Sequence, residues 1–253
     1  MALLEVRELS VRFGGVVALD RVSFTVEAGE VVGLIGPNGA GKTTLFNVIT
    51  RVYRPSAGSI SVDGSPVLKM APHEVIRRGV VRTFQNLALF RSMTVLDNVL
   101  VGDHIRTRSG WLESSVPMPS ALNAESASRK RALDMLDFVG LAQHAGHPVA
   151  ALPFGTQKRV ELARALVSKP RLLLLDEPAG GISHEEVDGV ARLLRRIHTE
   201  LGITMLLVEH HMAFVMGISE RVVVLDFGKK IAEGSPTEVQ RNPSVIEAYL
   251  GAA

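Results

Sequence analysis

Residues 36–43 are the segment of this sequence whose types and spacing most clearly suit a ligand. They match the pattern G-x-x-x-x-G-K-[ST] without a mismatch. Glycines in this pattern let the backbone turn so that successive N–H groups point at phosphate oxygens, and the following helix adds the positive end of its dipole. The sequence therefore predicts a nucleoside triphosphate site formed by Gly36, Pro37, Asn38, Gly39, Ala40, Gly41, Lys42, Thr43 and, one position on, Thr44.

Three side chains of this loop have separate expected roles. Lys42 is expected to reach the β- and γ-phosphates, and Thr43 to place its hydroxyl on Mg²⁺. Thr44 can donate to the next phosphate along. The alternative is a glycine-rich turn that only joins a strand to a helix, and the complete motif argues against it.

A pair of carboxylates, Asp176 and Glu177, follows an apolar run. A carboxylate at the end of a buried strand needs a positively charged partner, and Mg²⁺ held by a nucleotide is a natural one. Glu177 can accept a proton from the water that attacks the γ-phosphate, or orient that water. Helix capping around Pro178 is the alternative interpretation, and the phosphate-binding loop elsewhere in the chain favours the catalytic one.

Two histidines, His210 and His211, follow the apolar run 204–208 and Glu209. A neutral imidazole at this point can donate to a γ-phosphate oxygen or to the attacking water. Its place just past the end of a strand favours His210 for this role. His211 is the rival residue, and a solvent-facing histidine is the ordinary alternative for either.

These residues must be positioned by alternating strands and helices. Val31–Ile35 is typical of a buried strand, and the stretch from Lys42 to Thr50 carries apolar residues at helical spacing. Further buried strands are predicted at 171–176, 204–208 and 221–225, separated by helical stretches. Since ligands of such α/β sheets bind at the carboxyl ends of the strands, we expect Asp176, Glu177 and His210 to converge near the loop.

The rest of the chain divides into a β-rich and a helical part. Strands and turns prevail from Leu3 to about Phe84, with a tight turn at Asp63-Gly64 and a strand at 80–84. From about 87 to 167 helix prevails: Thr94 can cap a helix at 95–102, and the helix predicted at 125–138 carries its inner face on Ala132, Leu133, Leu136 and Phe138. The Ser- and Pro-rich stretch 108–123 predicts a loop or a frayed helix end.

Composition narrows the functional class. The 253 residues are 46% hydrophobic, which supports a substantial core, and the formal net charge of +2 indicates no nucleic-acid partner. The chain contains no cysteine, which excludes disulfides and thiolate metal sites. Charges appear too early for a signal peptide, and no apolar run approaches the roughly 20 residues that span a bilayer, so we expect a cytoplasmic protein.

The order of these motifs resembles that of the ATP-binding subunits of ABC transporters over nearly the whole chain. The family pattern is an aromatic, a P-loop, a glutamine loop, a signature loop, an Asp-Glu strand end and a switch histidine. The corresponding residues here are Phe13, Gly36–Thr43, Gln85, Leu152–Gln157, Asp176-Glu177 and His210. The resemblance implies that Phe13 stacks on adenine, that Gln85 senses Mg²⁺ and γ-phosphate, and that Gly155, Thr156 and Gln157 contact the nucleotide of a second subunit.

The resemblance and the strand pattern together predict an α/β fold. Its P-loop NTPase core has a mainly parallel sheet, an N-terminal antiparallel β region and an inserted helical subdomain. We expect one domain, with the core at about 1–86 and 168–236, the helical subdomain with the signature loop at about 87–167, and a C-terminal helical tail at about 237–253.

Within the family, four segments are similar to the LivG-type ATPases of branched-chain amino-acid importers. They are Arg12-Phe13-Gly14-Gly15, Thr83-Phe84-Gln85-Asn86, Glu209-His210 and the C-terminal stretch Asn242–Gly251. The resemblance implies an ATP- and Mg²⁺-dependent subunit on the cytoplasmic face of the membrane. Its expected partners are a second ATPase subunit, either a copy or a sister chain, transmembrane permease subunits and, indirectly, an extracytoplasmic solute-binding protein. Leu87, Leu89 and Phe90 either receive a helix of the permease or belong to the subdomain core.

Two positions depart from the family pattern. The signature loop has Pro153 where the common L-S-G-G-Q sequence has serine, so both the hydroxyl and an N–H are missing. Gly155 and the helix starting near Thr156 can still direct N–H groups at phosphate. Ser183 stands where many family members have aspartate.

Other functions remain open from the sequence. Related importers of urea or amides share much of the pattern. Cassette ATPases that act on nucleic acid or ribosomes need tandem cassettes or long inserts, and a GTPase would carry the N-K-x-D pattern, which is absent. The last alternative, motivated by Pro153, is a cassette that binds ATP as a switch without hydrolysing it.

Overall fold

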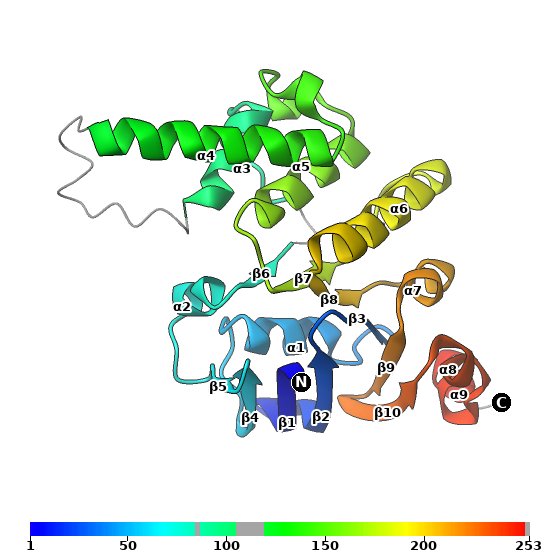
Figure 1. Ribbon diagram of the computed structural model, residues 1–253. Helices are drawn as coiled ribbons and strands as arrows, with labels where there is room; N and C mark the ends of the chain where they lie inside the picture. Colours follow the sequence, from blue (N-terminus) through cyan, green and yellow to red (C-terminus); the bar gives the residue numbers. More distant parts are fainter. Residues whose placement is uncertain (84–86, 105–118, 251–253) are drawn as a thin grey trace. The chain divides into compact units, whose positions relative to one another are not determined.

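The structure is a computed structural model that describes residues 1–83, 87–104 and 119–250. The chain divides into two compact units, one formed by Met1–Arg82 with Arg171–Ala253 and the other by Thr83–Pro170 (Figure 1). The predicted helical subdomain, about 87–167, falls inside the second unit. The functional division of the chain into core, helical subdomain and tail remains a prediction.

The first unit is built on a mainly parallel sheet. Among the described residues it contains six strands in the order β10-β9-β3-β8-β7-β6. Every pair is parallel except the hairpin of β9 and β10. The strands are β3 (Val31–Ile35), β6 (Val80–Arg82), β7 (Leu172–Asp176), β8 (Thr204–Val208), β9 (Arg221–Asp226) and β10 (Lys229–Gly234).

The central strands are buried on both faces. Every residue of β3, β7 and β8 is buried, which explains why their sequences are continuous apolar runs without alternation. β3 lies between β8 and β9. The phosphate-binding loop therefore starts at the end of a central strand, and hydrogen bonds to β8 and β9 hold that strand on both sides.

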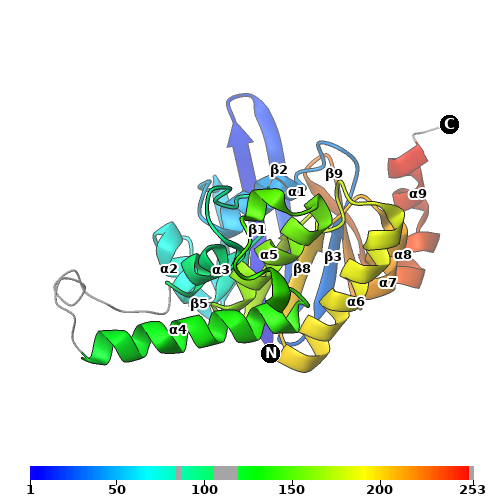
Figure 2. The same ribbon diagram turned by 90° about the horizontal axis from the view of Figure 1, so that it is seen from above.

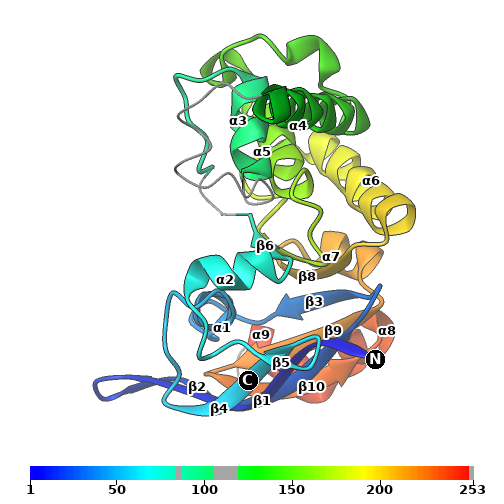
Figure 3. The ribbon, with the colours of Figure 1, turned by 60° about the vertical axis from the view of Figure 1, so that its left-hand side comes forward.

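A second sheet, antiparallel, is formed by the N-terminal part of the chain. Its order is β2-β1-β4-β5, with β1 (Ala2–Phe13), β2 (Val16–Glu27), β4 (Ala57–Val62) and β5 (Ser65–Pro66). The predicted tight turn at Asp63-Gly64 joins β4 to β5, and both residues have positive φ. Figure 3 shows this sheet on one side of α1 (Lys42–Ile49) and β3 on the other.

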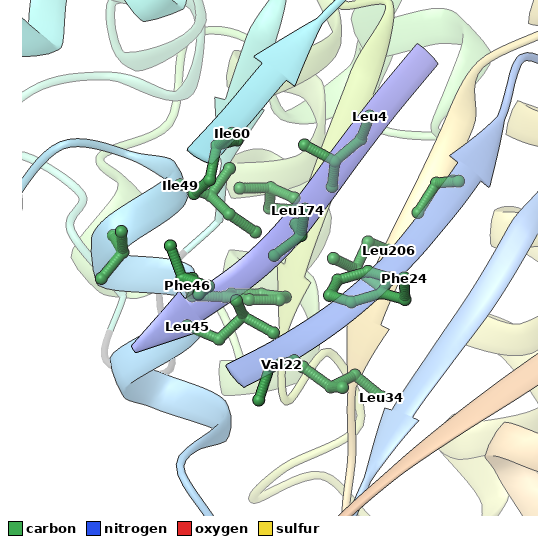
Figure 4. Close-up of a cluster of buried hydrophobic side chains, with 14 of the residues drawn as sticks. Leu4, Val22, Phe24, Leu34, Leu45, Phe46, Ile49, Ile60, Leu174 and Leu206 are labelled. Carbon is green, nitrogen blue, oxygen red and sulfur yellow. The ribbon is translucent and has the colours of Figure 1, made fainter. Parts of the chain in front are cut away.

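The main core fills the space between the two sheets around α1. Phe46, Leu45 and Ile49 of this helix are fully buried. They pack with side chains of both sheets, including Leu4 and Ile60 of the antiparallel sheet (Figure 4). Burying one side chain of this size contributes about 1.5–3 kcal/mol. The helix that opens at the phosphate-binding loop is thus anchored by its apolar face.

Among the described residues, the first unit contains five more helices. They are α2 (Pro72–Arg77), α6 (His184–Leu201), α7 (Met212–Ile218), α8 (Pro236–Arg241) and α9 (Pro243–Leu250). Ser183 precedes α6, and both its backbone N–H and its hydroxyl bond to Glu186, while Gly202 ends the helix with positive φ. Figure 2 shows α8 and α9 side by side.

The second unit is helical. Its described part contains α3 (Val95–Asp103), α4 (Pro119–Phe138), α5 (Phe154–Leu166) and two short 3₁₀ helices, Ala142–His144 and Val149–Ala151. Thr94 caps α3 by accepting a hydrogen bond from the Asp97 N–H, as predicted. The three α-helices pack on one another (Figure 2).

The predicted fold class is confirmed, and three local predictions need correction. The strand predicted at 80–84 ends at Arg82. The helix predicted at 125–138 begins earlier, at Pro119. Its predicted inner face wrongly included Leu133, which is exposed, because Ala132, Leu136 and Val139 define a face from which Leu133 is turned by about 100°. Among the described helices none combines the length and apolar character of a membrane span.

Candidate functional site

The phosphate-binding loop owes its shape to glycine. Gly36 has φ 150°, and a Cβ added to it would lie 2.0 Å from the carbonyl oxygen of Leu225 in β9. Gly41 has φ 105°, and its added Cβ would lie 2.6 Å from the carbonyl oxygen of Ala18 in β2. Only glycine fits at these two points, because both the backbone angle and the space exclude a side chain.

Lys42 lies at the first position of α1 with its side chain buried. Its Nζ donates to the carbonyl oxygens of Gly36, at 2.6 Å, and Pro37, at 2.9 Å. Burial lowers the pKa of Lys42, and the negative charge of Glu177 opposes that shift. The ammonium group is therefore held inside the loop within the electrostatic reach of Glu177. Thr43, by contrast, is exposed.

Two distant segments hold the loop in place. The carbonyl oxygen of Ala40 accepts a hydrogen bond of 3.1 Å from the Gly228 N–H, in the turn between β9 and β10. The backbone of Gly36 forms a hydrogen bond with the hydroxyl of Tyr249 in α9. Burial raises the pKa of this tyrosine to about 12, and the hydrogen bond with the Gly36 backbone opposes that shift.

Asp176 ends β7 with its side chain buried, as the sequence predicted. Its positively charged partner in the structure is Arg82, whose Nη2 lies 2.5 Å from Oδ2 of the carboxylate. The same guanidinium donates from Nη1 to Asn47 at 2.7 Å and lies over the Phe46 ring. Sequence reasoning missed Arg82, although a single charge at the end of the apolar strand Val80–Arg82 was a usable signal.

Glu177 and His210 meet at the carboxyl ends of neighbouring strands. His210 Nε2 lies 2.8 Å from Glu177 Oε1, so the ring nitrogen donates to the carboxylate. The register explains the contact, because Asp176 of β7 pairs with Val208 of β8. His211, the rival residue, occupies the N-cap position of α7 and makes no side-chain capping bond there. The geometry therefore favours His210 as the partner of Glu177.

Phe13 lies at the end of β1 with its side chain nearly half exposed. The ring of Tyr53 contacts it edge to face, with 5.1 Å between ring centroids. This leaves Phe13 available for stacking on a base, while Tyr53 orients its ring. Tyr53 was not predicted, since nothing in the sequence near it indicates a contact across 40 positions.

The signature loop predicted from the sequence, Leu152–Gln157, lies in the second unit. Its helix, α5, begins at Phe154, with Pro153 at the N-cap. Gln157 turns back, because its Nε2 donates to the Leu152 carbonyl oxygen at 2.8 Å. Gly155 is buried and Thr156 is half-buried, while the exposed Phe154 ring faces the Lys158 ammonium. Gln85, the predicted sensor of Mg²⁺ and γ-phosphate, lies outside the described residues.

Comparison with known proteins supports one family for this chain. Residues 19–180 match the model of the ABC transporter family. Residues 229–253 match a second model, described as branched-chain amino acid ATP-binding cassette transporter. The C-terminal helices α8 and α9 lie within that second match.

Similar proteins are aligned over almost their full lengths. The high-affinity branched-chain amino acid transport ATP-binding protein BraF of Pseudomonas aeruginosa is 41% identical over 99% of this chain and 98% of its own. The corresponding protein LivG of Salmonella typhimurium is 42% identical over the same shares.

Solved structures of similar fold also come from this family. An ATP-binding cassette of an ABC transporter in its ADP conformation has a TM-score of 0.85 and 31% identity, covering 100% of both chains. A dimeric cassette bound to ADP and Pi has a TM-score of 0.77 and 27% identity, covering 92% of this chain and 98% of its own. By its sequence match and its fold, this chain belongs to the ABC transporter family, as an ATP-binding and ATP-hydrolysing subunit.

Proposed function

We propose that this chain supplies the ATP-driven step of an importer for branched-chain or related hydrophobic amino acids. The observation that carries the hydrolytic part is the Glu177–His210 contact of 2.8 Å at the strand ends. The solute class rests on similarity to BraF and LivG and on the match of residues 229–253.

The phosphate-binding loop and its Lys42 bind the β- and γ-phosphates. Lys42 now donates to two carbonyl oxygens of its own loop, so the loop already has the form of a ring around the ammonium group. Phosphate oxygens replace or supplement those acceptors when the nucleotide binds. The exposed Phe13 ring, supported by Tyr53, stacks on the adenine.

The donor set at this site fits Mg²⁺. Thr43 offers an exposed hydroxyl, and Asp176 offers a carboxylate whose Oδ2 bonds to Arg82 in this structure; both are the hard oxygen ligands that this ion prefers. Gln85 is the third proposed ligand. The bound ion would neutralise charge on the β- and γ-phosphates.

Glu177 and His210 act on the attacking water. Glu177 accepts its proton or orients it, and the imidazole of His210 donates either to Glu177, as in the structure, or to a γ-phosphate oxygen. The partner subunit supplies the remaining contacts through its own Gly155, Thr156 and Gln157, at the start of α5.

The proposed assembly contains a second ATPase subunit, transmembrane permease subunits and, on the other side of the membrane, a solute-binding protein. Closure of the two ATPase subunits on ATP drives the permease, and hydrolysis resets it. The solved dimeric cassette supports the pairing of two ATPase subunits. The chain would lie on the cytoplasmic face of the membrane.

The test is transport by the assembled complex. The chain is purified with its membrane subunits, reconstituted in vesicles with the solute-binding protein, and assayed for ATP turnover and for uptake of labelled leucine, urea and an aliphatic amide. Leucine uptake that requires ATP is the expected result. Uptake of urea or the amide alone would overturn the solute class.

Glu177→Gln tests the hydrolytic role within the same complex. Turnover is expected to fall about 10²- to 10⁴-fold, the usual contribution of a general base, while ATP still binds. If wild type turns over ATP no faster than this variant, the chain is a non-hydrolysing switch and the proposal fails.

A further inference from the structure

The backbone at Glu177 is in an unusual conformation. Its φ is 50°, in the left-handed region that residues other than glycine rarely adopt. A residue in such a conformation persists only where the surrounding structure holds it, and these residues cluster at functional sites. Two backbone hydrogen bonds fix its neighbourhood: the Glu177 N–H donates to Val208 at 2.9 Å, and its carbonyl oxygen accepts from Gly180 at 3.0 Å.

A third support comes from Glu209, the residue between β8 and His210. Its side chain is only 3% exposed. One carboxylate oxygen, Oε1, accepts from the backbone N–H of Ala179 at 2.7 Å. The other, Oε2, accepts from the backbone N–H of His210 at 2.7 Å, with the His211 N–H at 3.4 Å. A buried carboxylate is costly unless hydrogen bonds satisfy it, and here the two oxygens serve two different loops.

Each of these loops carries one member of the proposed catalytic pair. Ala179 lies two residues after Glu177, in the turn that gives Glu177 its positive φ. His210 is the ring that contacts Glu177. One buried carboxylate thus bridges the backbone of the two loops whose side chains meet in the Glu177–His210 contact.

We propose that Glu209 is a positioning residue that holds the loop after Glu177 and the backbone of His210 in the register needed for the Glu177–His210 contact. The inference rests on the proposed hydrolytic role of that pair. Both oxygens of Glu209 accept from backbone N–H groups, so the role assigned to its carboxylate is to hold the backbone and not to touch the substrate.

The chemistry of the bridge is specific to glutamate. A glutamine in its place presents one oxygen and one NH₂ group, and the NH₂ group would face a backbone N–H that needs an acceptor. Aspartate keeps the charge but is one methylene shorter, so it cannot reach both loops. Glu209→Gln and Glu209→Asp therefore break the bridge in two different ways.

The first measurement uses the isolated chain and needs no turnover. Amide hydrogen exchange of Ala179 and His210, and the ¹⁵N shift of His210 Nε2, are recorded by NMR for wild type, Glu209→Gln, Glu209→Asp, the reference Glu177→Gln and the control Glu200→Gln. Glu200 is an exposed glutamate of α6 whose carboxylate bonds to Arg196 one helical turn earlier. Protection of at least one of the two amides is expected to fall about 10-fold or more in both Glu209 variants, the effect of losing a hydrogen bond to a charged group.

The Nε2 shift of His210 should move in the Glu209 variants toward its value in Glu177→Gln, and should stay unchanged in Glu200→Gln. If Glu209→Gln does not fold, Glu209→Asp carries the test. Unchanged protection of both amides and an unchanged His210 shift in a folded Glu209 variant would overturn the inference.

The second measurement separates this inference from the proposed function. In the assembled complex, Glu209→Gln is expected to lower kcat about 10- to 100-fold with KM for ATP within about 2-fold, because it disturbs the pair and leaves the phosphate-binding loop intact. If wild type hydrolyses ATP and Glu209→Gln hydrolyses it equally fast, the positioning role is refuted and the hydrolytic function stands. No turnover in wild type would refute the hydrolytic function, while the NMR result would still decide whether Glu209 sets the contact.

Discussion

The phosphate-binding loop and the signature loop both lead into the N-terminus of a helix, and the structure stabilises them in different ways. Neither Gly41 at the start of α1 nor Pro153 at the start of α5 makes a side-chain capping bond. The phosphate-binding loop is instead enclosed by its surroundings, with close approach to β2 and β9 and hydrogen bonds to Gly228 and Tyr249.

The signature loop, Leu152–Gln157, makes local contacts among the described residues. At the start of α5 the side chain of Gln157 donates to the Leu152 carbonyl oxygen, and Phe154 is exposed beside Lys158. Under the proposed function, the first loop is a site complete within this chain, whereas the second is a surface that a nucleotide and another subunit complete. Changes to the first should therefore act on the isolated chain, and changes to the second should act mainly on the assembled complex.

The largest expected effect comes from Gly36→Ala. The new methyl group would collide with the Leu225 carbonyl oxygen, so β9 or the loop must move. Affinity of the isolated chain for ATP should fall by at least about 100-fold, measured by calorimetry, with a lower melting temperature. The matched control is Gly39→Ala, since Gly39 also has positive φ but has open space around its missing Cβ.

Gly39→Ala isolates the cost of the backbone angle alone, about 1–2 kcal/mol. Its ATP affinity should therefore fall much less than that of Gly36→Ala. Equal losses in the two variants would show that the contact with β9 does not shape the loop.

A smaller effect is expected from Pro153→Ser in the signature loop. Serine restores a hydroxyl and an N–H, and as an N-cap it should stabilise the isolated chain by about 1 kcal/mol in thermal unfolding. Turnover of the assembled complex should rise about 5-fold, the value of one added hydrogen bond, while ATP affinity of the isolated chain stays the same.

Pro148→Ser is the control for this change, because Pro148 is also the N-cap of a helix in the second unit, the 3₁₀ helix Val149–Ala151. It should leave turnover unaltered. If Pro153→Ser changed the ATP affinity of the isolated chain, the signature loop would act within a single chain. That result would contradict the difference inferred between the phosphate-binding loop and the signature loop.

The smallest effect is expected from Tyr249→Phe, which deletes the hydroxyl that bonds to the Gly36 backbone. One lost neutral hydrogen bond should weaken ATP binding about 3-fold. Tyr53→Phe serves as control, since Tyr53 contacts Phe13 through its ring, which the variant keeps. An unchanged affinity in Tyr249→Phe would remove α9 from the support of the loop.

The sequence predicted best where its signals are local. The strands Val31–Ile35 and Thr204–Val208 and the turn Asp63-Gly64 lie where continuous apolar runs and turn residues indicate them. The fold class followed from the alternation of such runs with helical spacing. Asp176, Glu177 and His210 could be placed at strand ends for the same reason.

What the sequence could not indicate are partners brought together from distant positions. Arg82 meets Asp176 across 94 positions, and Glu209 meets Ala179 across 30. Each is a single charged residue next to an apolar strand, and a sequence alone does not tell which buried group it will satisfy. The misplaced Leu133 has a different cause, since one residue of phase error on a helix moves a side chain from core to surface.

The position of β3 in the sheet also limits when the sheet can form during synthesis of the chain. Val31–Ile35 emerges early in synthesis, yet both of its neighbouring strands come from residues 204–226, and the hydroxyl bonded to Gly36 belongs to residue 249. Pairing over such sequence distances is slow and cannot begin until the late strands exist. A growing chain on the ribosome therefore carries its phosphate-binding sequence for most of translation before the strands on either side of β3 exist.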